Sequence, residues 1–215
     1  SIKRNENNTV DIIYGVNLGN KALIRNIKFI GNKIFKDNKL RKVIVSEESK
    51  FWKILSNKKN VDISRFKLDE KLLKNFYKNR GYYNVKINSS YAQIVEDKYF
   101  EIVFNIDAGN KFLFNELKLN MPDDYNKKDF NNIQQLLVEL KSKPYSLHRI
   151  EDILDEIEEI ALNNNYEFVS ATYNEKIIDG NNIEMSLHSL MNDKMAMINF
   201  LYRFVLNYLV YHMFL

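Results

Sequence analysis

The side chains best suited to catalysis are few and scattered in this sequence. The three histidines, His148, His188 and His212, fall in different predicted elements and lack the spacing of metal ligands. The absence of cysteine excludes thiolate nucleophiles, disulfides and the usual structural zinc sites. Asp69 and Glu70 are adjacent carboxylates, but at an exposed helix start they favour the helix N-terminus and do not form the buried pair that acid–base catalysis needs. We therefore expect that the chain is not an enzyme and binds no metal and no cofactor.

An internal repeat organises the chain. The segment 8–29 aligns without gaps with the segment 98–119, at an offset of 90 residues, and Gly-Asn-Lys recurs at 19–21 and 109–111. Alternating apolar residues on both sides of each Gly-Asn pair predict two strands that flank a tight junction between modules. Because glycine supplies unusual backbone angles, we expect a structural role at these junctions for Gly19, Asn20, Gly109 and Asn110.

Each repeat predicts a module of the order β-α-α-β-β. The first has a strand over 22–32, a helix near 39–45 capped by Asp37, a helix from 67–69 to Gly81, and a strand pair across Glu96-Asp97. The second has a strand over 112–120, helices over 130–140 and 147–162, and a strand pair across Asp179-Gly180. We assign four ranges: 1–20 as the C-terminal strand of a preceding module, 21–108 and 109–191 as two whole modules, and 192–215 as an apolar tail.

Charge distinguishes the two modules. Residues 21–110 carry 20 Lys and Arg against 10 Asp and Glu, whereas residues 111–194 carry 9 against 16. This asymmetry indicates two units with different surfaces. Two interpretations stay open: a basic face that meets an acidic partner, or solvated faces that differ in charge without a binding role.

The first module resembles a known family. Ile-Gly-Asn at 30–32 is followed by Phe35, then by the pair Phe51-Trp52 and by Phe-Tyr-x-x-Arg-Gly-Tyr at 76–82. Together with 100–112, these residues resemble the POTRA (polypeptide-transport-associated) domains of BamA-type outer-membrane protein assembly factors. In register, the chain is most similar to the third and fourth modules of a five-module array, with the end of the second at 1–20. The resemblance covers roughly residues 8–190.

The resemblance implies an α+β fold in which each POTRA module is a three-stranded mixed sheet packed on two helices. It also implies a periplasmic arm, attached to the outer membrane of a Gram-negative bacterium through a C-terminal barrel that is missing from this sequence. Such an arm binds unfolded outer-membrane proteins and docks accessory periplasmic lipoproteins. It has no catalytic activity, no cofactor and no nucleic-acid partner.

The mechanism that the resemblance implies is β-augmentation, in which an exposed sheet edge pairs with an extended client. The matching strand follows the second helix of the first module. Its candidate residues, after Asn84, are Val85, Lys86, Ile87, Asn88, Ser89, Ser90 and Tyr91. The equivalent stretch of the second module is 168–173. An ordinary hairpin strand without a client is the alternative interpretation.

The apolar tail departs from the family pattern. Residues 195–215 are almost continuously apolar and long enough to span a bilayer, but Arg203, Asn199 and Asn207 would make such a span costly. We interpret the tail as the product of a frameshift or truncation of the gene, which sequencing the coding DNA would test.

Two other functions are considered. The first is the POTRA region of a related carrier, such as a two-partner-secretion transporter, a TamA-type transporter or an organelle homologue. The second belongs to a different class, a basic nucleic-acid-binding module, for which the candidate residues are Lys33, Lys36, Lys39, Arg41 and Lys42. That basic run lacks a groove-reading motif and lies next to an acidic module that repels phosphate.

Overall fold

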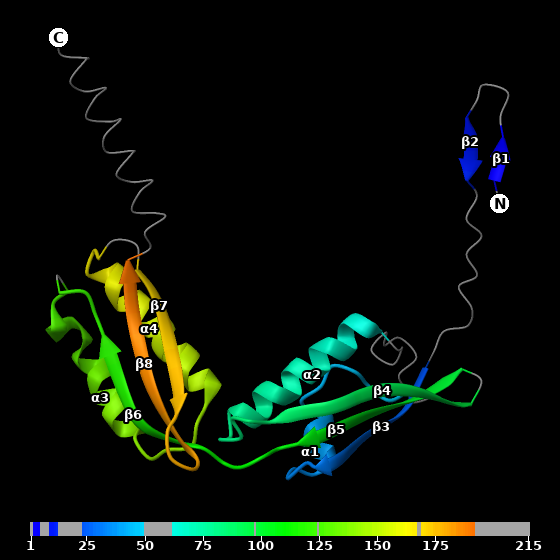
Figure 1. The fold of residues 1–215 in the computed structure, drawn as a ribbon, viewed down its shortest axis with the longest axis horizontal. Helices are drawn as coiled ribbons and strands as arrows, with labels where there is room; N and C mark the ends of the chain where they lie inside the picture. Colours follow the sequence, from blue (N-terminus) through cyan, green and yellow to red (C-terminus); the bar gives the residue numbers. More distant parts are fainter. Residues whose placement is uncertain are drawn as a thin grey trace.

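The structure, a computed structural model, consists of two successive α/β modules preceded by a short hairpin (Figure 1). It describes residues 2–4, 9–12, 23–49, 62–96, 98–123, 125–166 and 169–191. Phe51, Trp52, Gly19, Asn20 and the predicted apolar tail lie outside these residues. Within the described residues, no helix is both long and apolar enough to cross a membrane.

The first module is built on a mixed three-stranded sheet. Its elements are β3 (Leu23–Asn32), α1 (Asp37–Arg41), α2 (Ile63–Lys78), β4 (Lys86–Glu96) and β5 (Tyr99–Asp107). The central strand β5 pairs in parallel with β3 and antiparallel with β4, which gives the order β3-β5-β4. Both β3 and β4 are therefore edge strands.

The second module repeats this arrangement. Its elements are β6 (Leu113–Asn120), the 3₁₀ helix η2 (Lys127–Phe130), α3 (Asn131–Leu140), α4 (Leu147–Asn163), β7 (Val169–Ile177) and β8 (Asn182–Met191). The sheet order is β6-β8-β7, again with one parallel and one antiparallel ladder. The predicted β-α-α-β-β order and the mixed three-stranded sheets are confirmed in both modules. The bounds 21–108 and 109–191 stay predictions.

A short antiparallel hairpin precedes the two modules. It consists of β1 (Ile2–Arg4) and β2 (Val10–Ile12), with Ile2 opposite Ile12. The assignment of residues 1–20 to a preceding module stays a prediction.

Capping groups explain where the helices begin and end. Helix α2 begins at Ile63, earlier than the predicted start at 67–69, because the side chain of Asp62 accepts hydrogen bonds from the backbone N–H groups of Ser64 and Arg65. It ends before Gly81, whose φ of +95° is available to glycine at low cost. Helix α4 begins after Ser146, whose hydroxyl accepts from the N–H of Arg149.

The predicted capping role of Asp37 is wrong. Asp37 is the first residue of α1, and the extended residue Lys36 occupies the N-cap position without a side-chain cap. The carboxylate of Asp37 instead forms an ion pair with Lys33. The acidic residue still lies in the first helical turn, where it favours the helix dipole.

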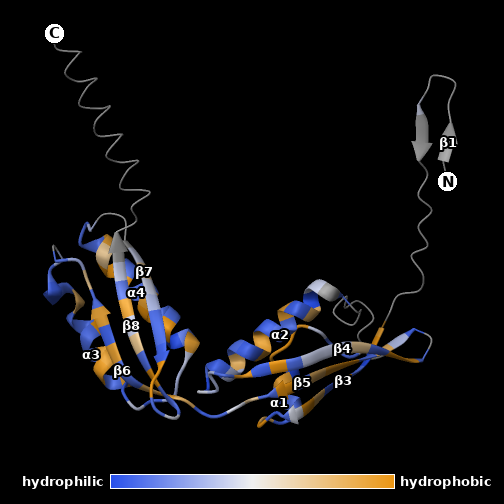
Figure 2. Ribbon diagram, viewed as in Figure 1, coloured by the Kyte–Doolittle hydropathy of each residue, from blue (hydrophilic) through white to orange (hydrophobic). Residues whose placement is uncertain are grey.

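Each module has its own hydrophobic core between the sheet and the helices. In the first, Ile27 and Phe29 of β3 and Phe104 of β5 pack against Leu73 and Tyr77 of α2. In the second, the inward residues of β6 and β8 pack against α3 and α4. Figure 2 shows the same division, with hydrophobic residues concentrated on β5, β6 and β8 and mixed polarity on α2 and α4. The two sheets together have four edge strands, β3, β4, β6 and β7.

Candidate functional site

The described histidines lie apart. In α4, His148 Nδ1 lies 3.4 Å from Asp152 Oδ1. On β8, His188 lies between the side-chain amides of Asn120 and Asn174. Over the described ranges, no group of three His, Cys, Asp or Glu side chains could hold a metal ion. His212 lies outside these ranges.

The carboxylates of Asp69 and Glu70 have structural partners, and their predicted place at an exposed helix start is wrong. Because α2 begins at Ile63, Asp69 lies in its second turn and is fully buried. Its Oδ1 accepts from the backbone N–H groups of Val45 (2.6 Å) and Ser46 (3.3 Å). Glu70 accepts a hydrogen bond from the hydroxyl of Ser90 on β4. These two side chains therefore attach a loop and a strand to the helix.

The predicted client edge corresponds to β4. Val85 precedes this strand and is buried, with 7% of its surface exposed, whereas Lys86 to Tyr91 form the first half of β4. The pairing with β5 shifts at Asn88 and again at Val95, so the ladder is regular from Ser89 to Ile94. On its other side, β4 has no neighbouring strand among the residues that the structure describes.

The exposed apolar side chains of β4 begin at Tyr91, the last predicted residue, and continue to Ile94 and Val95, which the prediction did not include. Tyr91, Ile94 and Val95 are 44%, 67% and 40% exposed. The adjacent apolar pair Ile94-Val95, directly before the turn, is the sequence signal that this part of the strand extends past the core. The exposed edge is therefore better described as 86–96.

A buried carboxylate ties β4 to the rest of its sheet. Glu101 on β5 forms an ion pair with Lys28 of β3 (2.8 Å) and accepts a hydrogen bond from Gln93 of β4 (3.0 Å). The hydrogen bond from Lys28 lowers the pKa of Glu101, against the opposing effect of burial. These contacts join one side chain from each of the three strands, and they attach β4 to the centre of its sheet.

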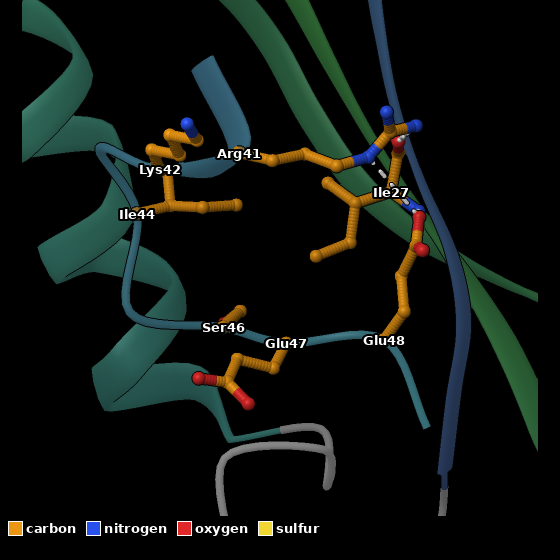
Figure 3. Close-up of a pocket in the computed structure, with 7 residues that line it drawn as sticks. All are labelled: Ile27, Arg41, Lys42, Ile44, Ser46, Glu47 and Glu48. Atoms are coloured by element: carbon orange, nitrogen blue, oxygen red, sulfur yellow. Dashed lines mark hydrogen bonds and ion pairs between the residues drawn. The ribbon is translucent and has the colours of Figure 1, made fainter. Parts of the chain in front are cut away.

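The opposite edge of this sheet, on β3, is covered by the segment that follows α1. The side chain of Glu48 accepts from the N–H of Ile27 (3.1 Å), and Arg41 Nη2 donates to the carbonyl of the same residue (2.8 Å). The backbone N–H of Ser49 donates to the carbonyl of Ile24 (2.6 Å). Arg41 Nε also donates to Glu48 (3.2 Å), beside a pocket of about 350 Å³ (Figure 3). These groups satisfy the edge in place of a neighbouring strand.

Both edges of the second sheet are also capped. The N–H of Phe114 on β6 donates to the carbonyl of Lys143, and its carbonyl accepts from the N–H of Ser142. On β7, the N–H of Ala171 donates to the carboxylate of Glu158 in α4 (2.8 Å). Of the four edges, β4 is the one whose backbone makes no hydrogen bond outside its ladder within the described residues.

The predicted nucleic-acid-binding run is largely engaged within the first module. Lys33 pairs with Asp37, and Arg41 is held by Glu48 and by a backbone carbonyl. Lys39 lies over the rings of Phe35 and Phe76. Lys36 is exposed, as is Lys42. These contacts account for three of the five basic groups without a nucleic acid.

The connection between the modules contains the predicted residues and also contacts that the sequence analysis did not identify. Gly109, with a φ of +64°, and Asn110 link β5 to β6 as predicted residues of the junction. The contacts across the junction come from the turn after α2: the carbonyl of Gly81 accepts from the N–H of Phe112, and Tyr83 packs on Phe112 and on Tyr145. Only the aromatic doublet Tyr82-Tyr83 after the helix stop hints at this role in the sequence.

Comparison with known proteins identifies the modules. The POTRA family model, described as a surface antigen variable number repeat, matches residues 22–109. The outer membrane protein assembly factor BamA of Neisseria meningitidis serogroup B is 27% identical over 152 residues, which are 70% of this chain and 19% of that protein. The two modules are POTRA domains of the BamA type.

A second relative and a solved structure are also similar to this chain. The assembly factor BamA of Buchnera aphidicola is 27% identical over 116 residues, which are 54% of this POTRA chain and 19% of that protein. The crystal structure of the POTRA3-5 segment of Haemophilus influenzae BamA superposes with a TM-score of 0.59 at 16% identity, covering 80% of this chain and 67% of that one. The shared fold is thus established, and the chain spans about a fifth of the length of the relatives it matches. The placement as third and fourth modules stays a prediction.

Proposed function

We propose that this POTRA pair is part of the periplasmic arm of an outer-membrane protein assembly factor, without enzymatic activity, and that it receives unfolded β-barrel proteins along the free edge of β4. The relatives are assembly factors of the outer membrane, which supports the class of function and the location. The single observation that carries the choice of β4 is the contrast among the four edges. Three of them have at least one backbone group capped by a neighbouring segment, and β4 has none within the described residues.

An uncapped edge favours pairing with an extended chain. Backbone N–H and C=O groups on the free side of β4 exchange bonds to water for bonds to a client, and this recognition depends little on client sequence. The exposed side chains of Tyr91, Ile94 and Val95 add apolar contact area along the same strand. We further propose that accessory periplasmic lipoproteins dock on this arm, as the BamA-type resemblance implies.

Site-specific photocrosslinking in the full-length protein tests this proposal. A photoreactive residue at Tyr91 or Ile94 is expected to capture unfolded outer-membrane proteins in cells, whereas the same residue at Ile30, exposed on the capped strand β3, is the matched control. Hydrogen exchange supplies a second measurement, since the amides of β4 should gain protection when a client binds. Capture at Ile30 with none along β4 would refute the assignment of the edge.

A further inference from the structure

Helix α2 carries a row of lysines along one side. Lys67, Lys71, Lys74 and Lys78 are spaced so that, at about 100° per residue, they fall within an arc of about 60° of the helix surface. Lys67 and Lys71 are exposed, and Lys74 and Lys78 are half-buried. None of the four forms an ion pair with another described residue, although Lys78 lies over the ring of Tyr83, 5.6 Å from its centroid. The row is therefore a strip of positive charge without a carboxylate partner in the described part of the chain.

This lysine row lies on the side of α2 that borders the free edge of β4. Around the helix, Glu70 falls between the buried residue Tyr77 and the lysine row, and its carboxylate accepts a hydrogen bond from Ser90 of β4. Helix α2 runs along β4 over much of its length (Figure 1). A strand added beyond β4 would accordingly lie beside the lysine row.

The second module shows how the same helix positions relate to its own sheet edge. Each helix is followed by a residue with positive φ, Gly81 after α2 and Asn165 after α4. In both, the N–H of the next residue donates to the carbonyl of a buried residue in the last turn. Superposing the sequences on these ends aligns the lysines with acidic residues of α4. The aligned pairs are Lys67 with Glu151, Lys71 with Asp155, and Lys74 with Glu158.

One of these acidic residues reaches the edge strand directly. Glu158 Oε1 accepts a hydrogen bond of 2.8 Å from the backbone N–H of Ala171 on β7. A side chain at this helix position is therefore long enough to contact the outer side of the neighbouring strand. Lys74 occupies the equivalent position over β4 and has a longer side chain, so its ammonium group can reach a strand paired with β4.

We propose that the β4 edge selects extended segments that carry carboxylates on the side chains facing α2, and that Lys67, Lys71, Lys74 and Lys78 provide this selectivity. The inference rests on the proposed function of β4 and adds a chemical class of client to it. The spacing of the lysines is close to the spacing of side chains on one face of a strand. Successive lysines advance about 4.5 to 6 Å along the helix, and alternate residues of a strand advance about 6.6 Å. Carboxylates at every second residue of the client thus match the row.

The second module has the opposite preference at its edge. With Glu151, Asp155 and Glu158 in the aligned positions, α4 repels acidic segments, and Glu158 already occupies one N–H of β7. The charge asymmetry of the sequence thereby becomes a difference between two equivalent edges. Acidic segments would therefore bind at β4 and not at the capped edge of β7.

Two matched peptides test the proposal on the full chain. Both have the same β-prone sequence, with Glu at alternate positions in one and Lys in the other, and each carries a fluorophore for anisotropy titration. We expect the acidic peptide to bind about tenfold more tightly at low salt, because several partly exposed ion pairs each add a modest free energy, and the preference should shrink as salt is raised. Capture of the acidic peptide by a photoreactive residue at Tyr91 locates the binding.

Charge reversal provides the decisive comparison. The triple variant Lys67→Glu, Lys71→Glu and Lys74→Glu should reverse the preference, whereas Lys127→Glu, Lys128→Glu and Lys141→Glu changes the net charge equally, on exposed positions of the other module, and should leave it unchanged. Equal effects of the two triple variants would overturn the inference, since net charge alone would then explain binding. Equal binding of both peptides with capture at Tyr91 would overturn this inference and leave β4 as the client edge. Absence of capture along β4 with either peptide would overturn the proposed function itself.

Discussion

The side-chain oxygen of Asn79 accepts a hydrogen bond of 2.8 Å from the backbone N–H of His148. Asn79 is the C-cap residue of α2, and His148 lies in the first turn of α4. A residue of one POTRA module thus satisfies one of the free N–H groups at the start of a helix in the next, beside the cap that Ser146 provides within that helix. The two modules therefore share a capping site, and their relative orientation is linked to the stability of α4.

Substitution of Asn79 tests this link. The change Asn79→Ala removes the acceptor, and we expect the free energy of unfolding of the second module to fall by about 1 kcal/mol, as for loss of a helix cap. Since the chain has no cysteine, pairs of introduced cysteines can carry spin labels, and the distance distribution between modules should broaden. Asn79→Asp retains an acceptor oxygen and should restore both properties; an unchanged distribution in Asn79→Ala would contradict the linking role.

A second prediction concerns alkaline pH. Burial, together with the nearby carboxylate of Glu175, raises the pKa of Tyr83 to about 12, and burial also raises the pKa of Tyr145, whose hydroxyl donates to Glu175 (2.8 Å). Because the unfolded chain releases these protons near pH 10, the stabilisation is complete below about pH 10 and is lost as the pH rises from there toward about 12. Chemical unfolding of the second module across this range should show a steep loss of stability.

The matching variants separate these tyrosines from other groups that titrate at high pH. Tyr83→Phe and Tyr145→Phe should each make the fall in the free energy of unfolding shallower. The double variant should be the least dependent on pH. If all three curves ran parallel to that of the unsubstituted chain, the two phenols would not be the source of the effect.

The cap on β3 gives a third prediction. Arg41→Ala leaves the carbonyl of Ile27 without its donor and frees part of the β3 edge. We expect a loss of about 1 kcal/mol in the free energy of unfolding of the first module and a concentration-dependent self-association through β3. Light scattering after size-exclusion chromatography would detect the association, with Lys42→Ala, an exposed neighbour, as the control that should remain monodisperse.

Two glycines with positive φ provide a fourth prediction. A Cβ atom at Gly31 (φ +82°) would lie 2.5 Å from the backbone oxygen of Ile106, whereas one at Gly180 (φ +57°) would meet nothing within 4 Å. Both alanine variants incur the cost of a left-handed conformation, about 1 to 2 kcal/mol, but only Gly31→Ala must also displace the central strand. Thermal unfolding should therefore show a clearly larger loss for Gly31→Ala, and equal losses would be inconsistent with the close approach at Ile106.

Hydropathy period and turn residues were sufficient to predict the elements of both modules. The strand over 22–32 and the pair across Asp179-Gly180 lie within a few residues of β3, β7 and β8, because alternating apolar residues and glycine turns depend on local chemistry. The start of α2 was predicted late, since Asp62 precedes a stretch without a clear apolar period. The hydropathy period and the turn residues did not predict contacts between residues far apart in the sequence.

The candidate site illustrates that limit. The candidate edge strand was taken from the POTRA resemblance, which by position indicated the strand after the second helix and so the first half of β4. The covering of β3 by Arg41 and Glu48, and the burial of Asp69, depend on how a loop returns to the sheet, which no spacing in the sequence encodes. Tyr83 was likewise not identified, because its partners Phe112 and Tyr145 belong to the next module.

The parallel ladder between β3 and β5 has a mechanical consequence. The chain enters the first module at Leu23, opposite Tyr99, and leaves it past Asp107, opposite Asn32. Tension along the array therefore pulls these two neighbouring strands in opposite directions, parallel to their length. All the hydrogen bonds of the ladder then bear the force together. This shear geometry resists force better than a geometry in which the bonds break one after another. Strand β4 lies on the other side of β5, so its hydrogen bonds do not bear this force. Under the proposed function, a client paired with β4 would leave or join the sheet without breaking the hydrogen bonds that carry the tension.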